Sequence, residues 1–325
     1  MKRLAKGEGY GNVYLEDADM PQLTSRSVLV RAHTSLISRG SEILRRYRAE
    51  GPVDPAIMGY SLAGTVTAVG DEARAAGFVP GDRVFALSPH AEYVAVDVEP
   101  ERMRVRTLPA AVPWHRAPFQ SLAQAAVAWA EASQGRATDT VVVLGQGLVG
   151  NLVMQAHRVR GVARVITVDT LEIRVRLSAE LGADVALTSG QVDAVAEVRR
   201  LTDGRGADVV VDCVGGPPGL QSFQDALEMV KDDGILHLIG LYHGQPLSLD
   251  SGKIQRKLLI GGYHIPRPLG VYADRAAELL ATGRLAVDQL ITHRFPVERA
   301  PEAFALLDQH LDKAVGVLLE WTAAG

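Results

Sequence analysis

Residues 140–150 read TVVVLGQGLVG, and this stretch decides the fold. It begins with an apolar run that is typical of a buried strand, and the pattern G-x-G-x-x-G follows at once. The first glycine permits a tight turn, the second lets a pyrophosphate approach the backbone, and the third lets the next helix lie close to the strand. The unpaired N–H groups at the helix start attract phosphate, so we expect a dinucleotide to bind here. The turn and the helix start comprise Gly145, Gly147, Leu148, Val149 and Gly150.

An acidic residue ends the next strand, which we expect at residues 164–169. Asp169 stands nineteen residues after Gly150, where a carboxylate accepts hydrogen bonds from both ribose hydroxyls of an adenosine. The 2′-phosphate of NADP would meet a like charge there, so Asp169 favours NAD. Arg174 either covers the adenine or ribose side of the cofactor or is a helix residue that faces solvent.

Strands and helices alternate with short connections after about residue 120. We expect strands at 140–145, 164–169, 184–188, 208–215 and 234–241, and helices at 148–160, 172–181, 192–201 and 220–230. This alternation predicts a doubly wound parallel sheet. Earlier residues form short Val-rich runs separated by Pro and Gly, at 27–33, 63–70, 82–87 and 91–96. We therefore expect an α/β protein in which a parallel sheet is joined to a β-rich domain. Two further helices, at 271–282 and 300–311, and a strand at 314–320 follow.

The composition excludes several classes of protein. The chain has 325 residues, of which 47% are apolar and 22% charged, and this is typical of a folded protein with two domains. The net charge of −4 and the lack of a basic block argue against nucleic acid and anionic membranes as partners. The single cysteine, Cys213, forms no intrachain disulfide and supplies no Cys-rich zinc site. We expect no signal peptide and no membrane span, and hence a cytoplasmic protein.

Several segments, in the right order, resemble the medium-chain dehydrogenase/reductase superfamily, which includes the zinc-type alcohol and polyol dehydrogenases. These segments are SVLVRAHTSLISRGSE, IMGYSLAGTVTAVG, FVPGDRV, AEYVAV, LGADVALT, GADVVVDCVGG, GILHLIGLY and THRFPVERAPEAFALLD. The resemblance covers nearly the whole chain. It implies a GroES-like catalytic domain at residues 1–119 and 265–325, and an NAD-binding Rossmann domain at residues 120–264.

The resemblance also implies further cofactor contacts and a mode of assembly. Two strands of the Rossmann domain end beside the nicotinamide in relatives, and the residues there are Val214, Gly240, Leu241 and Tyr242. Relatives dimerise by pairing the edge strands of their Rossmann domains. The apolar segment 257–264 can supply such an edge, so we expect a homodimer.

The positions that hold catalytic zinc in the family carry other residues in this chain. The spacing places Arg39 (or Ser38, one residue off), Tyr60 and Gln120 there. Zinc prefers thiolate, imidazole or carboxylate ligands, and an arginine would repel it. The four-cysteine lobe that holds a structural zinc in the family is also absent from the sequence. We therefore expect a member that binds no metal.

Protein side chains must then polarise the substrate oxygen and move its proton. The Tyr60 phenol either donates to a carbonyl, or accepts from an alcohol if its pKa is lowered, or is a packed tyrosine. Ser41 matches a proton-relay position of zinc members, with a turn or cap residue as the alternative. His90 lies where the missing lobe would be and is either a base or an ordinary loop histidine. Arg39 either holds an oxyanion or is a surface arginine. Gln120 either hydrogen-bonds a substrate hydroxyl or is only the first residue of a secondary-structure element.

Together these residues predict a zinc-independent, NAD-dependent oxidoreductase that interconverts a secondary alcohol and a ketone. The polar candidate residues favour a hydroxyl-bearing small molecule, such as a sugar or cyclitol. Two alternatives stay open. One is an enone or quinone reductase of the same superfamily, and the other is a dinucleotide-binding protein without catalytic activity.

Overall fold

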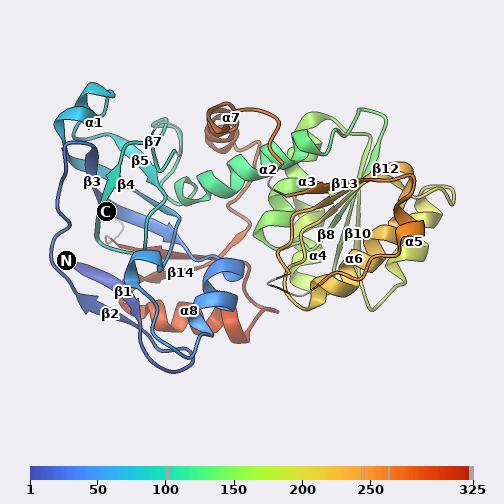
Figure 1. Cartoon of the computed structure of the whole chain (residues 1–325), viewed down its shortest axis with the longest axis horizontal. Helices are drawn as coiled ribbons and strands as arrows, with labels where there is room; N and C mark the ends of the chain where they lie inside the picture. Colours follow the sequence, from blue (N-terminus) through green and yellow to red (C-terminus); the bar gives the residue numbers. More distant parts are fainter. Residues whose placement is uncertain (100–102, 243, 245, 263, 322–325) are drawn as a thin grey trace. The chain divides into compact units, whose positions relative to one another are not determined.

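The computed structural model describes residues 1–99, 103–242, 244, 246–262 and 264–321 (Figure 1). The chain divides into two units. The split unit comprises Met1–Ala123, Ala273–Gly283 and Val287–Gly325, and the parallel-sheet unit comprises Gln124–Tyr272 and Arg284–Ala286. The expected domain boundaries, 1–119 with 265–325 and 120–264, stay a prediction.

The parallel-sheet unit contains six parallel strands in the order β10-β9-β8-β11-β12-β13. In chain order they are β8 (Thr140–Leu144), β9 (Arg164–Asp169), β10 (Val185–Thr188), β11 (Ala207–Asp212), β12 (Val230–Leu238) and β13 (Leu258–Gly261). The helices are α3 (Leu148–Arg160), α4 (Glu172–Glu180), α5 (Ala194–Leu201) and α6 (Pro218–Met229), with the 3-10 turn η4 (Ser251–Ile254). Consecutive residues Val141, Val142 and Val143 are all fully buried, because helices cover both faces of such a sheet. The expected α/β fold with a doubly wound sheet is confirmed.

The split unit contains two sheets. One is a hairpin of β1 (Lys2–Lys6) and β2 (Val13–Asp17), which the sequence analysis did not foresee. The other has the order β14-β15-β3-β4-β5-β7, and β6 also pairs with β3. Its strands are β3 (Ser27–Leu36), β4 (Leu62–Val69), β5 (Arg83–Ala86), β6 (Tyr93–Asp97), β7 (Val105–Thr107), β14 (Ile291–Pro296) and β15 (Gly316–Glu320). This sheet provides the β-rich part of the expected fold.

The helices around these sheets are short, apart from two near the unit boundaries. They are α1 (Asp71–Ala75), α8 (Ala300–Gln309), and the 3-10 turns η2 (Pro55–Ile57), η3 (Ala117–Phe119) and η5 (Val297–Arg299). The two longer helices are α2 (Gln120–Ala132) and α7 (Leu269–Ala281). None of the helices that the structure describes has the length and apolar character of a membrane span.

The segment between β3 and η2 is a π-helix, η1 (Arg39–Tyr47), where the resemblance implied only a loop. Glu42, Ile43 and Tyr47 are the residues that η1 buries. The apolar pair packs into a core formed with α8 and the hairpin, while Glu42 turns toward the polar residues described below. Pi-helical turns are rare overall, and many of those known lie at functional sites. The η1 segment therefore indicates a candidate functional site in this part of the split unit.

Candidate active site

The glycine turn joins β8 to α3 with a geometry that fits a dinucleotide. Gly145 has a φ of +82°, a left-handed conformation that favours glycine. A Cβ on Gly150 would lie 1.7 Å from the carbonyl oxygen of Gly145, so a side chain does not fit there. A Cβ on Gly147 would meet nothing within 4 Å, which leaves the backbone open to a ligand. The left-handed Gly145, the close contact at Gly150 and the open backbone at Gly147 are the three features that let this motif bind a pyrophosphate.

Internal hydrogen bonds hold the same turn rigid. The side-chain amide of Gln146 donates to a β8 carbonyl at 2.8 Å, and Asn151 Nδ2 donates to the carbonyl of Gln146 at 2.7 Å. Gly147 is the N-cap of α3 and offers no side chain to the helix start. The N–H groups at Leu148 and Val149, the first residues of the helix, therefore point to a place where an anion can bind.

Asp169 ends β9 and lies against the glycine turn. One carboxylate oxygen accepts a hydrogen bond from the backbone N–H of Gln146 at 2.6 Å, and the other accepts from Leu171 N–H at 2.9 Å. Arg174 Nη1 is 3.6 Å from Asp169 Oδ2, and the Arg174 side chain is only 14% exposed. The alternative in which Arg174 faces solvent is therefore wrong, and the arginine shares the expected ribose site with Asp169.

A buried carboxylate that the sequence analysis missed lies at the carboxyl end of β11. Asp212 accepts hydrogen bonds from Tyr242 Oη at 2.7 Å, Ser222 Oγ at 2.8 Å and Val214 N at 3.0 Å. Burial raises the pKa of Asp212 to about 6, although these three donors oppose the shift. The detectable signal was an acidic residue at the end of an apolar strand, next to the expected cofactor residues.

The same carboxylate gathers most of the cofactor residues that the resemblance implied on this side. Tyr242 and Val214 both bind Asp212, and the N–H of Gly240 donates to the Asp212 carbonyl at 2.9 Å. A Cβ on Gly240 would lie 2.1 Å from the carbonyl oxygen of Val214, so the two strand ends touch. The Leu241 side chain is half exposed, while its carbonyl accepts a hydrogen bond from Gly216 N–H at 2.9 Å.

In the split unit, Tyr60 lies among serine hydroxyls. Its phenol donates to Ser38 Oγ at 2.9 Å, and Ser41 lies close enough to the phenol to lower its pKa. Burial raises the pKa of Tyr60, and the nearby Glu42 carboxylate adds to the effect. The phenol therefore keeps its proton, and the alternative with a lowered pKa is wrong. Tyr60 and Ser41, which were both candidates from the sequence, are thus brought together.

His90 is enclosed, contrary to the expectation that it acts as a base on the substrate. Its Nε2 is 2.7 Å from Glu42 Oε2 and its Nδ1 is 2.8 Å from Ser35 Oγ, so both ring nitrogens are occupied. The other oxygen of Glu42 accepts from Ser38 N–H at 2.9 Å. Gly59, with a φ of +112°, passes so close to the imidazole that a Cβ there would lie 2.7 Å from it. His90 therefore supports the backbone around Tyr60.

The two remaining candidates lie in the same unit. Gln120 starts α2, is buried, and donates from Nε2 to the carbonyl of Ala273 at 2.8 Å. Its Oε1 is buried without a hydrogen-bond partner among the described residues. Arg39 is the first residue of η1, and its Nε is shielded from solvent. Neither side chain, nor the Tyr60 phenol, is a donor that zinc prefers.

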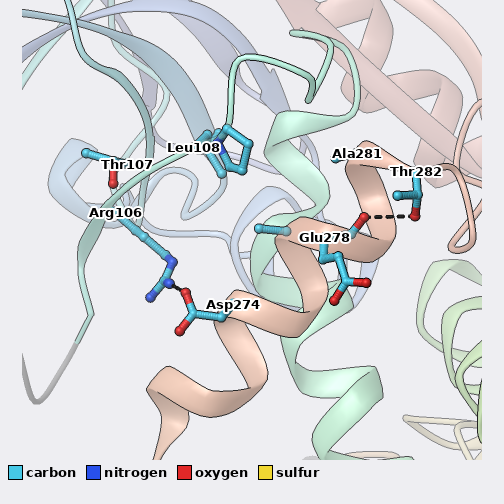
Figure 2. A pocket seen from close by; sticks show the side chains of 9 residues that line it. Arg106, Thr107, Leu108, Asp274, Glu278, Ala281 and Thr282 are labelled. Carbon is cyan, nitrogen blue, oxygen red and sulfur yellow. Dashed lines mark hydrogen bonds and ion pairs between the residues drawn. The ribbon is translucent and has the colours of Figure 1, made fainter.

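A cavity of about 550 Å³ lies elsewhere in the split unit, between β7 and α7 (Figure 2). Arg106 and Asp274 point toward each other across it and form an ion pair. The residues that line it are Arg106, Thr107, Leu108, Pro109, Asp274, Ala277, Glu278, Ala281 and Thr282. It contains none of the candidate catalytic residues.

Comparisons with known proteins agree with this fold and these motifs. Residues 149–279 match the family described as zinc-binding dehydrogenase. D-arabitol-phosphate dehydrogenase of Enterococcus avium is 26% identical over 94% of this chain and 93% of its own length. Sorbitol dehydrogenase of Bacillus subtilis is 24% identical over 94% of both chains.

Solved structures extend the likeness over the whole chain. Alcohol dehydrogenase TADH from Thermus sp. ATN1 superposes with a TM-score of 0.86 at 27% identity and covers 99% of this chain and 100% of its own. Two other structures of this fold, at 20% and 22% identity, hold NADH and NADP respectively. The relatives are dehydrogenases, so the prediction of a dehydrogenase is confirmed. This chain is an oxidoreductase whose residues 149–279 match the zinc-binding dehydrogenase family, and it is similar over nearly its whole length to dehydrogenases of that kind.

Proposed function

We propose that this chain is a zinc-independent, NAD(H)-dependent oxidoreductase that interconverts a secondary alcohol and a ketone. The observation that carries the proposal is the set of hydroxyls around Tyr60, at a position where the family places a zinc ligand. Two relatives are named for polyols, D-arabitol phosphate and sorbitol. We therefore propose a hydroxyl-rich small molecule, such as a sugar or cyclitol, as the substrate.

Ketone reduction requires a hydride at carbon and a proton at oxygen. The dinucleotide, when bound, supplies the hydride. Ser38 Oγ accepts the hydrogen bond of the Tyr60 phenol, so its own hydrogen is available to a substrate oxygen and polarises the carbonyl, and Ser41 lies beside the phenol. When Ser38 gives its proton to the alkoxide oxygen, Tyr60 returns a proton to Ser38, and the partly exposed Ser41 passes one from solvent to Tyr60. Alcohol oxidation runs the same transfers in reverse and releases the proton to solvent.

The donor set supports the proposal that no zinc takes part. Arg39 carries a positive charge, Gln120 offers a neutral amide, and Tyr60 keeps its proton because burial raises its pKa. A zinc ion would have to deprotonate the phenol and lie near a guanidinium, and both cost free energy. The Ser38 hydroxyl, which the Tyr60 phenol polarises, replaces the metal as the group that faces the developing charge.

Asp169 supports NAD over NADP. Its carboxylate stands beside the glycine turn, where it can accept from the ribose hydroxyls and repel a 2′-phosphate. Arg174 reduces that repulsion because its Nη1 is 3.6 Å away. We propose that the chain binds NAD more tightly than NADP. The difference in affinity is smaller than an aspartate without a neighbouring arginine would give.

We further propose a homodimer formed through the edge of the parallel sheet. β13 ends the strand order, and Leu258 in it is 50% exposed. An apolar edge strand with free backbone groups needs a cover or a partner. Residue 263, in the expected segment 257–264, lies outside the described residues. Light scattering tests this proposal, and a monomer mass at working concentration would count against it. The cytoplasmic location stays a prediction.

The decisive experiment is an activity screen of the purified protein with its metal content measured. We expect turnover of secondary polyols with NAD, less than one zinc per chain, and no loss of activity after treatment with a chelator. Turnover of enones with NADPH instead would favour the reductase alternative. One tightly bound zinc that leaves together with activity would refute zinc independence.

A further inference from the structure

One partly buried arginine of η1 lacks an ion-pair partner among the described residues. Arg46 lies in the last turn of this π-helix, is largely shielded from solvent, and its Nη1 is buried without a hydrogen-bond partner. Within the part of the chain that the structure describes, Arg46 forms no ion pair. Its neighbour Arg48 is different, because it pairs with Asp308 at 2.6 Å. A shielded cation without an anion is costly, and proteins retain one where a ligand supplies the missing charge.

The acidic residue that could neutralise Arg46 is already engaged. Glu42 lies four positions earlier on η1, so the two side chains belong to neighbouring turns. One Glu42 oxygen lies against His90, and the other accepts from the backbone of Ser38. A carboxylate held in this way cannot turn to meet the guanidinium. Among the residues that the structure describes, the charge of Arg46 is therefore available to a ligand.

Arg46 also lies close to the proposed reaction site. Its charge acts on the Tyr60 phenol, where it opposes the rise that burial causes in the pKa. Ser38, which binds the phenol, is the residue before η1, and Ser41, which lies near the phenol, is in the first turn of η1. A substrate whose oxygen meets these hydroxyls would thus bring its neighbouring groups toward Arg46.

We propose that Arg46 binds an oxyanion of the substrate, so that the enzyme acts on a hydroxy compound that carries a phosphate ester or a carboxylate. Arginine is suited to this task because its planar guanidinium donates two parallel hydrogen bonds to either group. The proposal rests on the proposed function and deepens it by naming the substrate class. Neutral polyols are still turned over, but with a lower kcat/KM, and the anionic group determines which carbon lies beside the hydroxyls.

The test compares three matched substrates: a pentitol, its phosphate monoester and the corresponding aldonate. We expect wild-type kcat/KM to be highest for one of the two anionic compounds. Which of the two it is distinguishes phosphate from carboxylate. In Arg46→Ala, the ratio of kcat/KM for that compound over the neutral pentitol should fall at least ~10-fold, since hydrogen bonds to charged groups are among the strongest. Arg46→Lys should recover part of the ratio.

The matched control is Arg45→Ala, which removes the same charge from the adjacent, exposed position of η1. Its ratio should stay within about two-fold of the wild type, because exposed charges act weakly. An equal loss for all three substrates in Arg46→Ala would overturn the proposal. So would a weaker NADH affinity in calorimetry, because the guanidinium would then serve the dinucleotide.

A binding measurement separates this proposal from the proposed function. Inorganic phosphate and acetate are titrated into wild type and Arg46→Ala, and the thermal midpoint is recorded. Stabilisation of the wild type alone supports an oxyanion site even if no alcohol is oxidised, in which case only the proposed function fails. Turnover of neutral polyols without any anion effect would leave the proposed function standing and refute the role of Arg46.

Discussion

Glu42 and His90 form a buried pair in which Oε2 lies 2.7 Å from Nε2, with side-chain exposures of 0% and 1%. The pair joins η1 to the residues just before β6, and Ser35 on β3 holds the other side of the imidazole. Trp321 Nε1 donates to the same Ser35 hydroxyl at 2.9 Å. Hydrogen bonds thus connect this buried pair to β3 and to Trp321, which are distant in sequence within the split unit.

We predict that this pair stabilises the fold and does not exchange protons with substrate. Glu42→Ala leaves a buried imidazole without its partner and should lower the free energy of unfolding by roughly 3–5 kcal/mol. Urea unfolding measures the change. The control is Glu302→Ala, which breaks an exposed pair with Arg299 and should cost less than about 1 kcal/mol. A His90→Ala variant of normal stability that has lost a limb of the pH profile would instead make His90 the base.

Tyr60→Phe tests the chemistry. Removal of one preorganised donor to developing negative charge costs ~10²–10³ in turnover where the donor is essential, so we expect at least a ~10-fold loss in kcat. NADH affinity should stay within about two-fold, because the hydroxyl acts on the substrate. Tyr14→Phe, at an exposed tyrosine of β2, is the matched control. A fully active Tyr60→Phe would show that the phenol only packs.

Cofactor choice should follow the charge balance between Asp169 and Arg174. Wild type should bind NADH at least ~10-fold more tightly than NADPH, since a hydrogen bond to a charged group is worth roughly 1.5–3 kcal/mol. Asp169→Asn keeps an acceptor for the backbone but removes the charge, so it should narrow the gap in calorimetric titration. Arg174→Ala should widen it. Equal wild-type affinities would contradict the role of Asp169.

Asp212 should make stability depend on pH in a defined window. Its pKa rises from 3.8 to about 6 on folding, so the folded state binds the proton more tightly than the unfolded state. The free energy of unfolding should therefore fall by roughly 3 kcal/mol as pH rises from about 4 to about 6, and level off above that range. Asp212→Asn should remove this part of the pH dependence in urea unfolding. The control, Asp19→Asn at an exposed aspartate, should leave it unchanged. An unchanged slope in Asp212→Asn would show that another group titrates.

The sequence was sufficient to predict those features that depend on neighbours along the chain. The glycine turn, the strand before it and Asp169 at the next strand end follow from local spacing, and the parallel sheet follows from the alternation around them. Tyr60 and Ser41 were found because the family resemblance aligns them with positions of known chemistry. In the structure, Tyr60 hydrogen-bonds Ser38, and Ser41 lies near the same phenol.

Pairing across long stretches of chain was beyond the reach of sequence patterns. Glu42 and His90 are far apart in sequence, and nothing local distinguishes an enclosed histidine from a loop histidine. The raised pKa of Tyr60 depends on burial, which a single position does not reveal. The sequence left Arg174 open between the cofactor side and solvent, and only the structure shows that its side chain turns back to Asp169.

The order of strands in the split unit has a consequence for synthesis on the ribosome. β15 pairs with both β14 and β3, so the sheet that carries η1 and Tyr60 lacks a central strand until residues 316–320 have emerged. The strands of the parallel-sheet unit all come from 140–261 and can pair while translation continues. The nascent chain therefore forms its parallel-sheet unit first. The part of β3 that pairs with β15, residues 34–36, stays unpaired until β15 has been made. A chaperone that binds this unpaired edge would act on the chain before the sheet that carries η1 and Tyr60 is complete.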